Sequence, residues 1–241
     1  MQTTESLKRR IKSAGDLLSV VKTMKALAAV SIRQYQKAVE SLEDYNRTVE
    51  MGLQIVLKER MGATMQRKDA SIKRLGAIIF GSDQGLCGQL NEQIAVFALD
   101  DINGAGVKKE NRKVLAVGAR VADYVEDAGQ PVEELMTTPS STAGITPLVQ
   151  EIIMIIEEWH FRQNVDHFVL FYNDYISGSN YQPYKVQLLP VNRDWLKDIA
   201  RKKWDSKSLP IFRMDCNRIF SSLIREYLFV SLYRAFAESL A

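Results

Sequence analysis

A long heptad pattern runs through TESLKRRIKSAGDLLSVVKTMKALAAVSIRQYQKAVESLEDYNRTVEMGLQIV, residues 4–56. Steps of four and three residues, taken alternately from Leu7, land on apolar side chains at every position except Lys25 and Asn46. The seam positions are Leu7, Ile11, Ala14, Leu18, Val21, Lys25, Ala28, Ile32, Tyr35, Val39, Leu42, Asn46, Val49, Leu53 and Val56. Thr4 is a suitable N-cap, so the pattern predicts a helix about 75 Å long that projects from any small domain attached to it.

A second helix without glycine or proline is predicted from about residue 212 to Ala241. Its end contains no capping Gly or Asn, so we expect it to be cut before its natural end. The two helices are expected to pair antiparallel, with the start of the later one beside the end of the first. Because the later helix is about half as long, it should reach only to around Val30 of the first. Leu7, Ile11, Leu18 and Val21 are then left for another chain, or for C-terminal residues outside this sequence, to cover.

Charge is unevenly distributed along the first helix. Between residues 1 and 38, many lysines and arginines face only Glu5 and Asp16, whereas residues 40–50 carry several acids. Each basic residue taken singly is consistent with an ordinary solvated helix face. Taken together, they predict that a partner presents acidic groups to the far half of the helix.

Short apolar runs separated by helical patterns follow Arg74, which is typical of a β-α-β layer. Strands are predicted at 75–80, 113–118, 166–172 and 184–190, with a weaker one at 132–138. Helices are predicted at about 89–101, 119–128 and 146–163. The fold class is therefore α/β, a Rossmann-like domain (74–205) joined to long N-terminal (1–60) and C-terminal (212–241) helices that form an antiparallel coiled coil.

The stretch FGSDQGLCGQLNEQ, residues 80–93, places three glycines directly after the first strand. A strand, a glycine loop and a helix can hold phosphate, but these glycines run G-x-x-x-G-x-x-G. That spacing is neither the dinucleotide fingerprint nor a P-loop, and no Lys-Ser/Thr pair follows Gly88. A tight turn with a helix cap is favoured over a cofactor site, and no cofactor is predicted.

Composition and the remaining residue types argue against several functions. The chain has 241 residues, 46% hydrophobic and 25% charged, with a net charge of +3, which fits a folded protein and favours neither a nucleic-acid binder nor an acidic one. Cys87 and Cys216 form no motif, so a reducing compartment is expected. His160 and His167 lack metal-ligand spacing, and no nucleophile-base-acid set can be assigned. No apolar run approaches the ~20 residues that span a bilayer, so membrane association should go through a partner.

Four segments, taken in order, resemble one family: Arg10–Ser13, VKTMKALAAVSIRQYQKA (21–38), GSDQGLCGQLN (81–91) and YRAFAESLA (233–241). The chain resembles the gamma subunits, the central rotor shafts of the rotary F-type ATP synthases. The resemblance implies a non-catalytic shaft inside a hexamer of alpha and beta subunits. It also implies a base that rests on the ring of membrane c subunits and contacts epsilon, at the cytoplasmic face of the bacterial inner membrane.

The same resemblance implies which residues contact partners. Met24 and Lys25 match the helix segment that faces the acidic lever of a beta subunit, and the loop would meet the lower rim of the hexamer. The predicted contact residues are Arg9, Arg10, Met24, Lys25, Arg33, Ser82, Asp83, Gln84, Gly85, Leu86, Cys87, Gly88 and Asn91. Gln84 stands where the family usually has Arg. With departures around Asp16 and Ser31, it indicates a divergent branch, either an alternative or a sodium-linked synthase.

Two other functions remain open from the sequence. A nucleotide-binding α/β enzyme would bind ATP or NAD saturably. A basic coiled-coil adaptor for nucleic acid would bind DNA with a steep dependence on salt.

Overall fold

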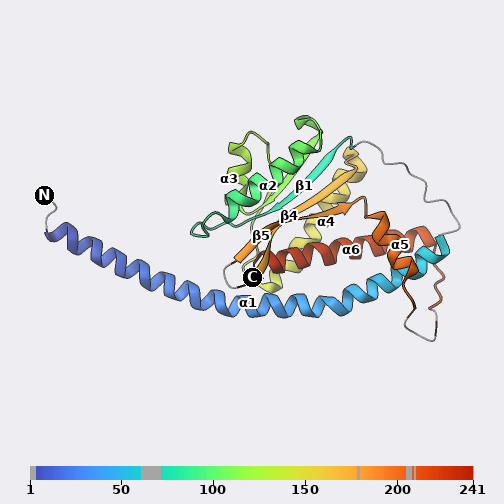
Figure 1. Cartoon of the computed structure of the whole chain (residues 1–241), viewed down its shortest axis with the longest axis horizontal. Helices are drawn as coiled ribbons and strands as arrows, with labels where there is room; N and C mark the ends of the chain where they lie inside the picture. Colours follow the sequence, from blue (N-terminus) through green and yellow to red (C-terminus); the bar gives the residue numbers. More distant parts are fainter. Residues whose placement is uncertain (1–3, 61–71, 178–179, 205–207, 209, 241) are drawn as a thin grey trace.

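A 57-residue helix, α1 (Thr4–Arg60), is the longest element of the protein and extends far beyond the rest of it (Figure 1). The structure, a computed structural model, describes residues 4–60, 72–177, 180–204, 208 and 210–240. At about 1.5 Å per residue, α1 is about 85 Å long. The second half of the predicted seam is covered: Tyr35, Leu42, Val49, Leu53 and Val56 are buried. The seam therefore has two parts, one packed and one not.

The second long helix, α6 (Cys216–Ser239), covers that packed part, as predicted. It begins where the Asp215 side chain accepts hydrogen bonds from the backbone N–H groups of Asn217 and Arg218. It runs antiparallel to α1 (Figure 1). Near its start Leu223 lies against Gly52, so closely that a Cβ at Gly52 would lie 2.9 Å from Leu223 Cδ2. The missing side chain of this glycine lets the two helices approach.

A short helix that the sequence did not predict, α5 (Arg193–Arg201), completes this junction. The Asn192 side chain caps it by accepting hydrogen bonds from the next turn. Leu196 and Ile199 of α5 pack with Leu53 of α1 in one buried cluster. Although α5 falls within the predicted 74–205 domain, its apolar face thus packs against the long helices.

Five strands form one sheet in the order β3-β2-β1-β4-β5. β1 (Leu75–Phe80), β2 (Arg112–Val117), β3 (Glu134–Met136) and β4 (His167–Ser177) are parallel, and β5 (Asn180–Leu189) is antiparallel to β4. All four firmly predicted strands are present within a few residues, and the weaker one at 132–138 is real but short. Residues 178–179, between β4 and β5, lie outside the described residues.

Helices cover both faces of the sheet, which explains why every residue of β1 is buried. On one face lie α2 (Leu90–Gly104) and α3 (Ala119–Asp127). On the other lie α4 (Ile145–Gln163) and the C-terminal half of α6. Two 3-10 turns, η1 (Lys109–Asn111) and η2 (Thr142–Gly144), precede β2 and α4.

The helix α6 belongs to two cores at once. Phe236 near its end stacks on Phe80 of β1, with ring centroids 3.9 Å apart, and Glu238 accepts a hydrogen bond from the Tyr172 hydroxyl of β4. Nearer its start, Glu226 accepts a 2.5 Å hydrogen bond from the Tyr45 hydroxyl of α1. α6 thereby fixes the long helix to the sheet domain.

The predicted three-part division at 1–60, 74–205 and 212–241 stays a prediction, and its limits at 1, 205 and 241 lie outside the described residues. Within those that are described, no helix is both long and apolar enough to cross a bilayer.

Candidate functional site

The first half of α1, residues 4–30, is the uncovered part of the seam and is called the projecting segment. Its apolar side chains are exposed, including those at seam positions whose counterparts later in α1 are packed. The exposed ones are Leu7, Ile11, Leu17, Leu18, Val20, Val21, Met24, Leu27 and Val30. A patch of this extent on a folded protein marks a surface that another molecule covers.

These apolar side chains also spread well beyond the seam, which the one-sided pattern did not predict. Leu18 and Leu27 are nine residues apart and therefore lie on opposite sides of a helix that turns about 100° per residue. They are 55% and 64% exposed. Lys8, Lys12 and Lys22 lie on the remaining side, so the exposed apolar side chains cover most of the circumference rather than one narrow stripe. The projecting segment therefore fits a partner that contacts more than one of its sides.

The predicted basic contact residues lie along the same helix. Arg9, Arg10, Lys25 and Arg33 are all exposed, and Met24 is 43% exposed. Arg9 lies 4.0 Å from Glu5, but both side chains are almost fully solvated, so this ion pair contributes little. These cations are accessible to an acidic partner.

The glycine-containing loop between β1 and α2, residues 81–89, lies at the end of the sheet domain toward which α1 projects (Figure 1). Its tip is Gln84, Gly85 and Leu86, all exposed, with Leu86 90% exposed. Leu86 and Gly88 have positive φ angles of 68° and 59°. The loop thus presents an apolar side chain to solvent on a tight turn.

Asp83 does not point outward but fastens the loop to its neighbours. One carboxylate oxygen accepts from the Ala119 N–H at the start of α3, and the other accepts from the N–H and hydroxyl of Thr138. Burial acts to raise the pKa of Asp83, but the three hydrogen bonds outweigh it and hold the pKa below its ordinary value. Asp83 therefore anchors the loop in its charged, carboxylate form.

Asn91 and Ser82 hold the loop from inside. Asn91 is 4% exposed; its Oδ1 accepts from the Ser82 N–H at 2.8 Å, and its Nδ2 donates to Ser82 Oγ and Cys87 Sγ. Of the predicted contact residues in this loop, Gln84, Gly85, Leu86 and Gly88 are exposed. Ser82, Asp83, Cys87 and Asn91 shape the surface from beneath it. The sequence offered no signal for this division, because the partners of Asp83 lie far along the chain.

The same hydrogen bonds argue against the alternative that this chain is a nucleotide-binding enzyme. In open parallel sheets of this order, a nucleotide binds at the carboxyl ends of the strands, with phosphate on free N–H groups. Here the Ser82 N–H binds Asn91 and the Ala119 N–H binds Asp83. A carboxylate thus already occupies the start of α3, where it repels phosphate. This arrangement disfavours nucleotide binding at that edge.

Neither histidine has the surroundings of a metal ligand. His160 Nδ1 lies 2.8 Å from the Val165 carbonyl oxygen, and burial lowers the pKa of His167. Across the described part of the chain, no three His, Cys, Asp or Glu side chains gather closely enough to hold a metal ion.

Comparison with known proteins agrees with this architecture. The sequence model of the ATP synthase family matches residues 3–241. Similar curated proteins include the ATP synthase gamma chains of Nitrosomonas eutropha (23% identical) and Verminephrobacter eiseniae (27%). Each comparison covers all of this chain, and 83% and 82% of the respective relative.

Two solved structures share the fold. One is the central stalk and c-ring of the Tetrahymena thermophila mitochondrial ATP synthase, with a TM-score of 0.63, 15% identity and 92% of each chain covered. The other is the rotor of the Euglena gracilis mitochondrial ATP synthase, with a TM-score of 0.61 and 12% identity, covering 96% of this chain and 83% of that one.

Proposed function

Since this chain belongs to the ATP synthase family, as the match over residues 3–241 shows, we propose that it is the central shaft of a rotary ATP synthase. In this role it couples ion flow through a membrane ring to ATP synthesis or hydrolysis in a hexamer of alpha and beta subunits. It cleaves nothing itself. The curated relatives are gamma chains, and the similar solved chains come from a central stalk and a rotor.

One observation carries the proposal. The second half of α1 is packed, whereas its first half is bare, with exposed apolar side chains over most of its circumference and basic residues among them. The packed half, held by α5 and α6, joins the shaft to its base. The projecting segment enters the hexamer, whose inner surface encloses it. Burying the exposed leucines and valines supplies the hydrophobic contribution, at roughly 25 cal/mol per Å² of apolar surface covered.

The charged and looped residues have distinct roles in this arrangement. Lys25 stands on the seam among apolar neighbours, and we assign it to a carboxylate of a beta subunit. The exposed tip of the 81–89 loop meets the rim of the hexamer, because it faces the same direction as the projecting segment (Figure 1). The opposite end of the sheet domain faces the epsilon subunit and the c ring. The protein thus lies at the membrane surface, on the cytoplasmic side, without inserting into it.

Rotation changes which beta subunit faces the basic side of the shaft. A ligand or contact shifts a conformational equilibrium only by its differential affinity for the two states. An asymmetric shaft therefore favours a different state in each beta subunit in turn, and the states exchange as it rotates. The Tyr45–Glu226 hydrogen bond and the close contact at Gly52 resist slippage between shaft and base.

Assembly with alpha and beta subunits from the same source tests this proposal. The variant Leu18→Asp places a charge on the seam, and Ser19→Asp places the same charge at an exposed position on the polar side of the helix, which also carries Lys8 and Lys12. Both positions are solvated in the isolated chain, so each substitution should change its unfolding free energy by at most about 0.5 kcal/mol. We expect Leu18→Asp to reduce the yield of assembled, ATP-hydrolysing complex at least tenfold, and Ser19→Asp to reduce it much less.

Native mass spectrometry gives the stoichiometry, and ATPase activity of the purified complex gives function. Equal assembly of the two variants would show that the seam does not enter the hexamer.

In vesicles, Lys25→Glu should leave ATP hydrolysis in place but weaken its coupling to ion pumping. Unchanged coupling would remove Lys25 from the contact.

A further inference from the structure

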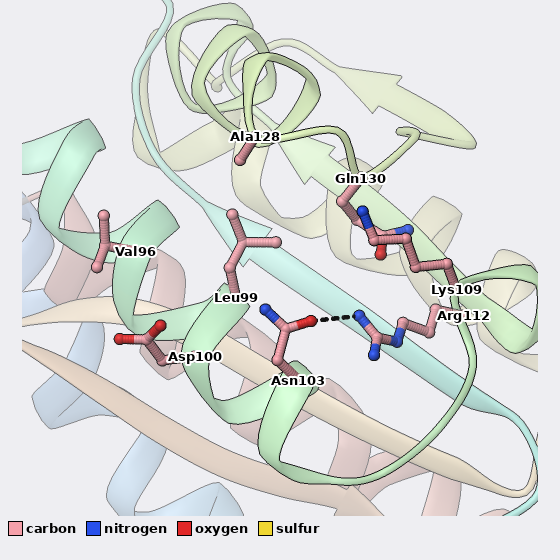
Figure 2. A pocket seen from close by; sticks show the side chains of 8 residues that line it. All are labelled: Val96, Leu99, Asp100, Asn103, Lys109, Arg112, Ala128 and Gln130. Carbon is pink, nitrogen blue, oxygen red and sulfur yellow. Dashed lines mark hydrogen bonds between the residues drawn. The ribbon is translucent and has the colours of Figure 1, made fainter.

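A cavity of about 270 Å³ opens between α2, the loop after α3 and the start of β2 (Figure 2). It lies on the α2 and α3 face of the sheet, away from α1 (Figure 1). Val96, Leu99 and Ala128 supply an apolar part of its wall. Its volume is near the lower end of the range for small-molecule sites, so it suits a ligand much smaller than a nucleotide.

Gln130 is the most informative residue in this cavity. It is 2% exposed, and its Oε1, which is shielded from solvent, has no hydrogen-bond partner in the described part of the chain. Its Nε2 lies 3.5 Å from the Pro131 carbonyl oxygen, a contact too long to hold the amide in one orientation. A buried acceptor without a donor is costly, so a ligand that brings an O–H or N–H group to Oε1 gains affinity.

Two cations lie on the same side of the cavity as Gln130 (Figure 2). Arg112 is held in place by two donated hydrogen bonds, from Nε to the Val107 carbonyl oxygen at 2.7 Å and from Nη1 to Asn103 Oδ1 at 2.6 Å. Within the described residues its Nη2 has no hydrogen bond. Lys109 Nζ donates to the Gly129 carbonyl oxygen, at 3.2 Å. A fixed guanidinium with free N–H groups is well suited to a carboxylate.

Asp100 limits which anion fits. It lies on α2, across the cavity from Lys109 and Arg112 (Figure 2). The charged side chains of the lining are therefore two cations and one anion, which favours a single negative charge over a polyphosphate. The ligand should thus combine one carboxylate, one hydrogen-bond donor and a short apolar part.

We propose that this cavity binds a small aliphatic α-hydroxycarboxylate. Its carboxylate accepts from Arg112 Nη2 and Lys109 Nζ, and the Gln130 amide turns toward the cavity so that Oε1 accepts from the ligand hydroxyl. Its aliphatic tail lies against Val96 and Leu99. The site is independent of the proposed shaft function, because none of its residues belongs to α1 or to the 81–89 loop.

The test compares two acids that differ only in the hydroxyl, 2-hydroxyisovalerate and isovalerate, by NMR titration of the full ¹⁵N-labelled chain. We expect the hydroxy acid to bind about fivefold to tenfold more tightly, as one additional buried hydrogen bond would give. Shifts should concentrate at the Gln130 side-chain amide and at backbone amides of residues 96–103 and 128–130.

Three variants separate the contributions. Gln130→Met keeps the side-chain length but removes the acceptor, so the preference for the hydroxy acid should disappear. Lys109→Gln should weaken both acids. Lys108→Gln is the matched control, because Lys108 is an exposed neighbour that does not line the cavity, and it should change neither affinity.

Equal affinity for the two acids in the original chain, or a preference that survives Gln130→Met, would overturn the proposal. The absence of shifts at these amides would overturn it as well. Thermal unfolding of each variant shows whether it is folded, and Lys109→Gln, on the surface, tests the anion contact even if the Gln130 variant fails to fold. None of these outcomes affects assembly with alpha and beta subunits.

Discussion

Replacing Gly118 with alanine should disturb the loop that the proposed function places against the hexamer. Gly118 has a φ angle of 110°, and a Cβ added there would lie 2.7–2.8 Å from the backbone N, C and O atoms of Ser82. An L-residue at positive φ costs about 1–2 kcal/mol, and forcing an extra carbon into packed structure adds about 1–3 kcal/mol. Backbone atoms cannot move aside as the end of a side chain can. Gly118→Ala should therefore lower the unfolding free energy by about 2–5 kcal/mol.

Two other glycines separate the cost of a positive φ angle from the cost of the steric contact. Gly106 has a φ angle of 70° but nothing within 4 Å of an added Cβ. Gly106→Ala should therefore lower the unfolding free energy only by the cost of the positive φ angle, about 1–2 kcal/mol. Gly15 lies in α1 with neither constraint, so Gly15→Ala should stabilise the helix by about 0.5–1 kcal/mol. Urea unfolding of the three variants measures the differences. Gly118→Ala should also shift the amide NMR signals of Ser82 to Gly88, whereas Gly106→Ala should not.

Equal losses for Gly118→Ala and Gly106→Ala would refute the reasoning, because the contact with Ser82 would then contribute nothing. A Gly118→Ala protein with unchanged loop signals would refute it too.

Two further predictions concern the junction and the loop anchor. Leu53 of α1 is 0% exposed where α1 meets α5 and α6, so Leu53→Ala should lower the unfolding free energy of the protein by about 2–5 kcal/mol. Leu18→Ala should change it by at most about 0.5 kcal/mol. Equal effects in urea unfolding would contradict the division of α1 into a packed and a bare half. Because the folded-state pKa of Asp83 is lowered, its contribution is present above the unfolded pKa of about 3.9 and is lost as pH falls through the folded value. Asp83→Asn should therefore be destabilised most near pH 7, and its difference from the original chain should shrink below about pH 4; a stability difference that does not change with pH would show that the charge of Asp83 does not contribute.

The elements that local periodicity controls could be predicted from the sequence. The heptad spacing in residues 4–56 gave the long helix, and the apolar run Leu75–Phe80 gave the central strand with the observed bounds. The mismatch in length between the two long helices also gave the point at which α1 becomes bare, because the rise per residue of a helix is fixed. The exposed basic residues follow from the same reasoning.

The short helix α5 and the direction of β5 could not be predicted in this way. Residues 193–201 are polar overall, and only Leu196, Ile199 and Ala200 become buried, against helices that lie far away in the chain. β5 pairs antiparallel with β4, whereas the other neighbouring strands are parallel. Long-range packing decides the burial of α5, and backbone pairing with β4 decides the direction of β5.

The sequence by itself determined that this protein is a long, half-bare helix attached to an α/β layer, because both facts follow from spacing along the chain. Only the tertiary structure decided which loop residues face outward. Asp83 resembles an exposed loop acid in sequence, yet its partners Ala119 and Thr138 lie 36 and 55 residues away. The exposure of apolar side chains outside the seam, such as Leu17 and Leu27, likewise became clear only from the packing. Hydrogen bonds and contacts between distant segments carry no local signal, so three-dimensional packing alone determines them.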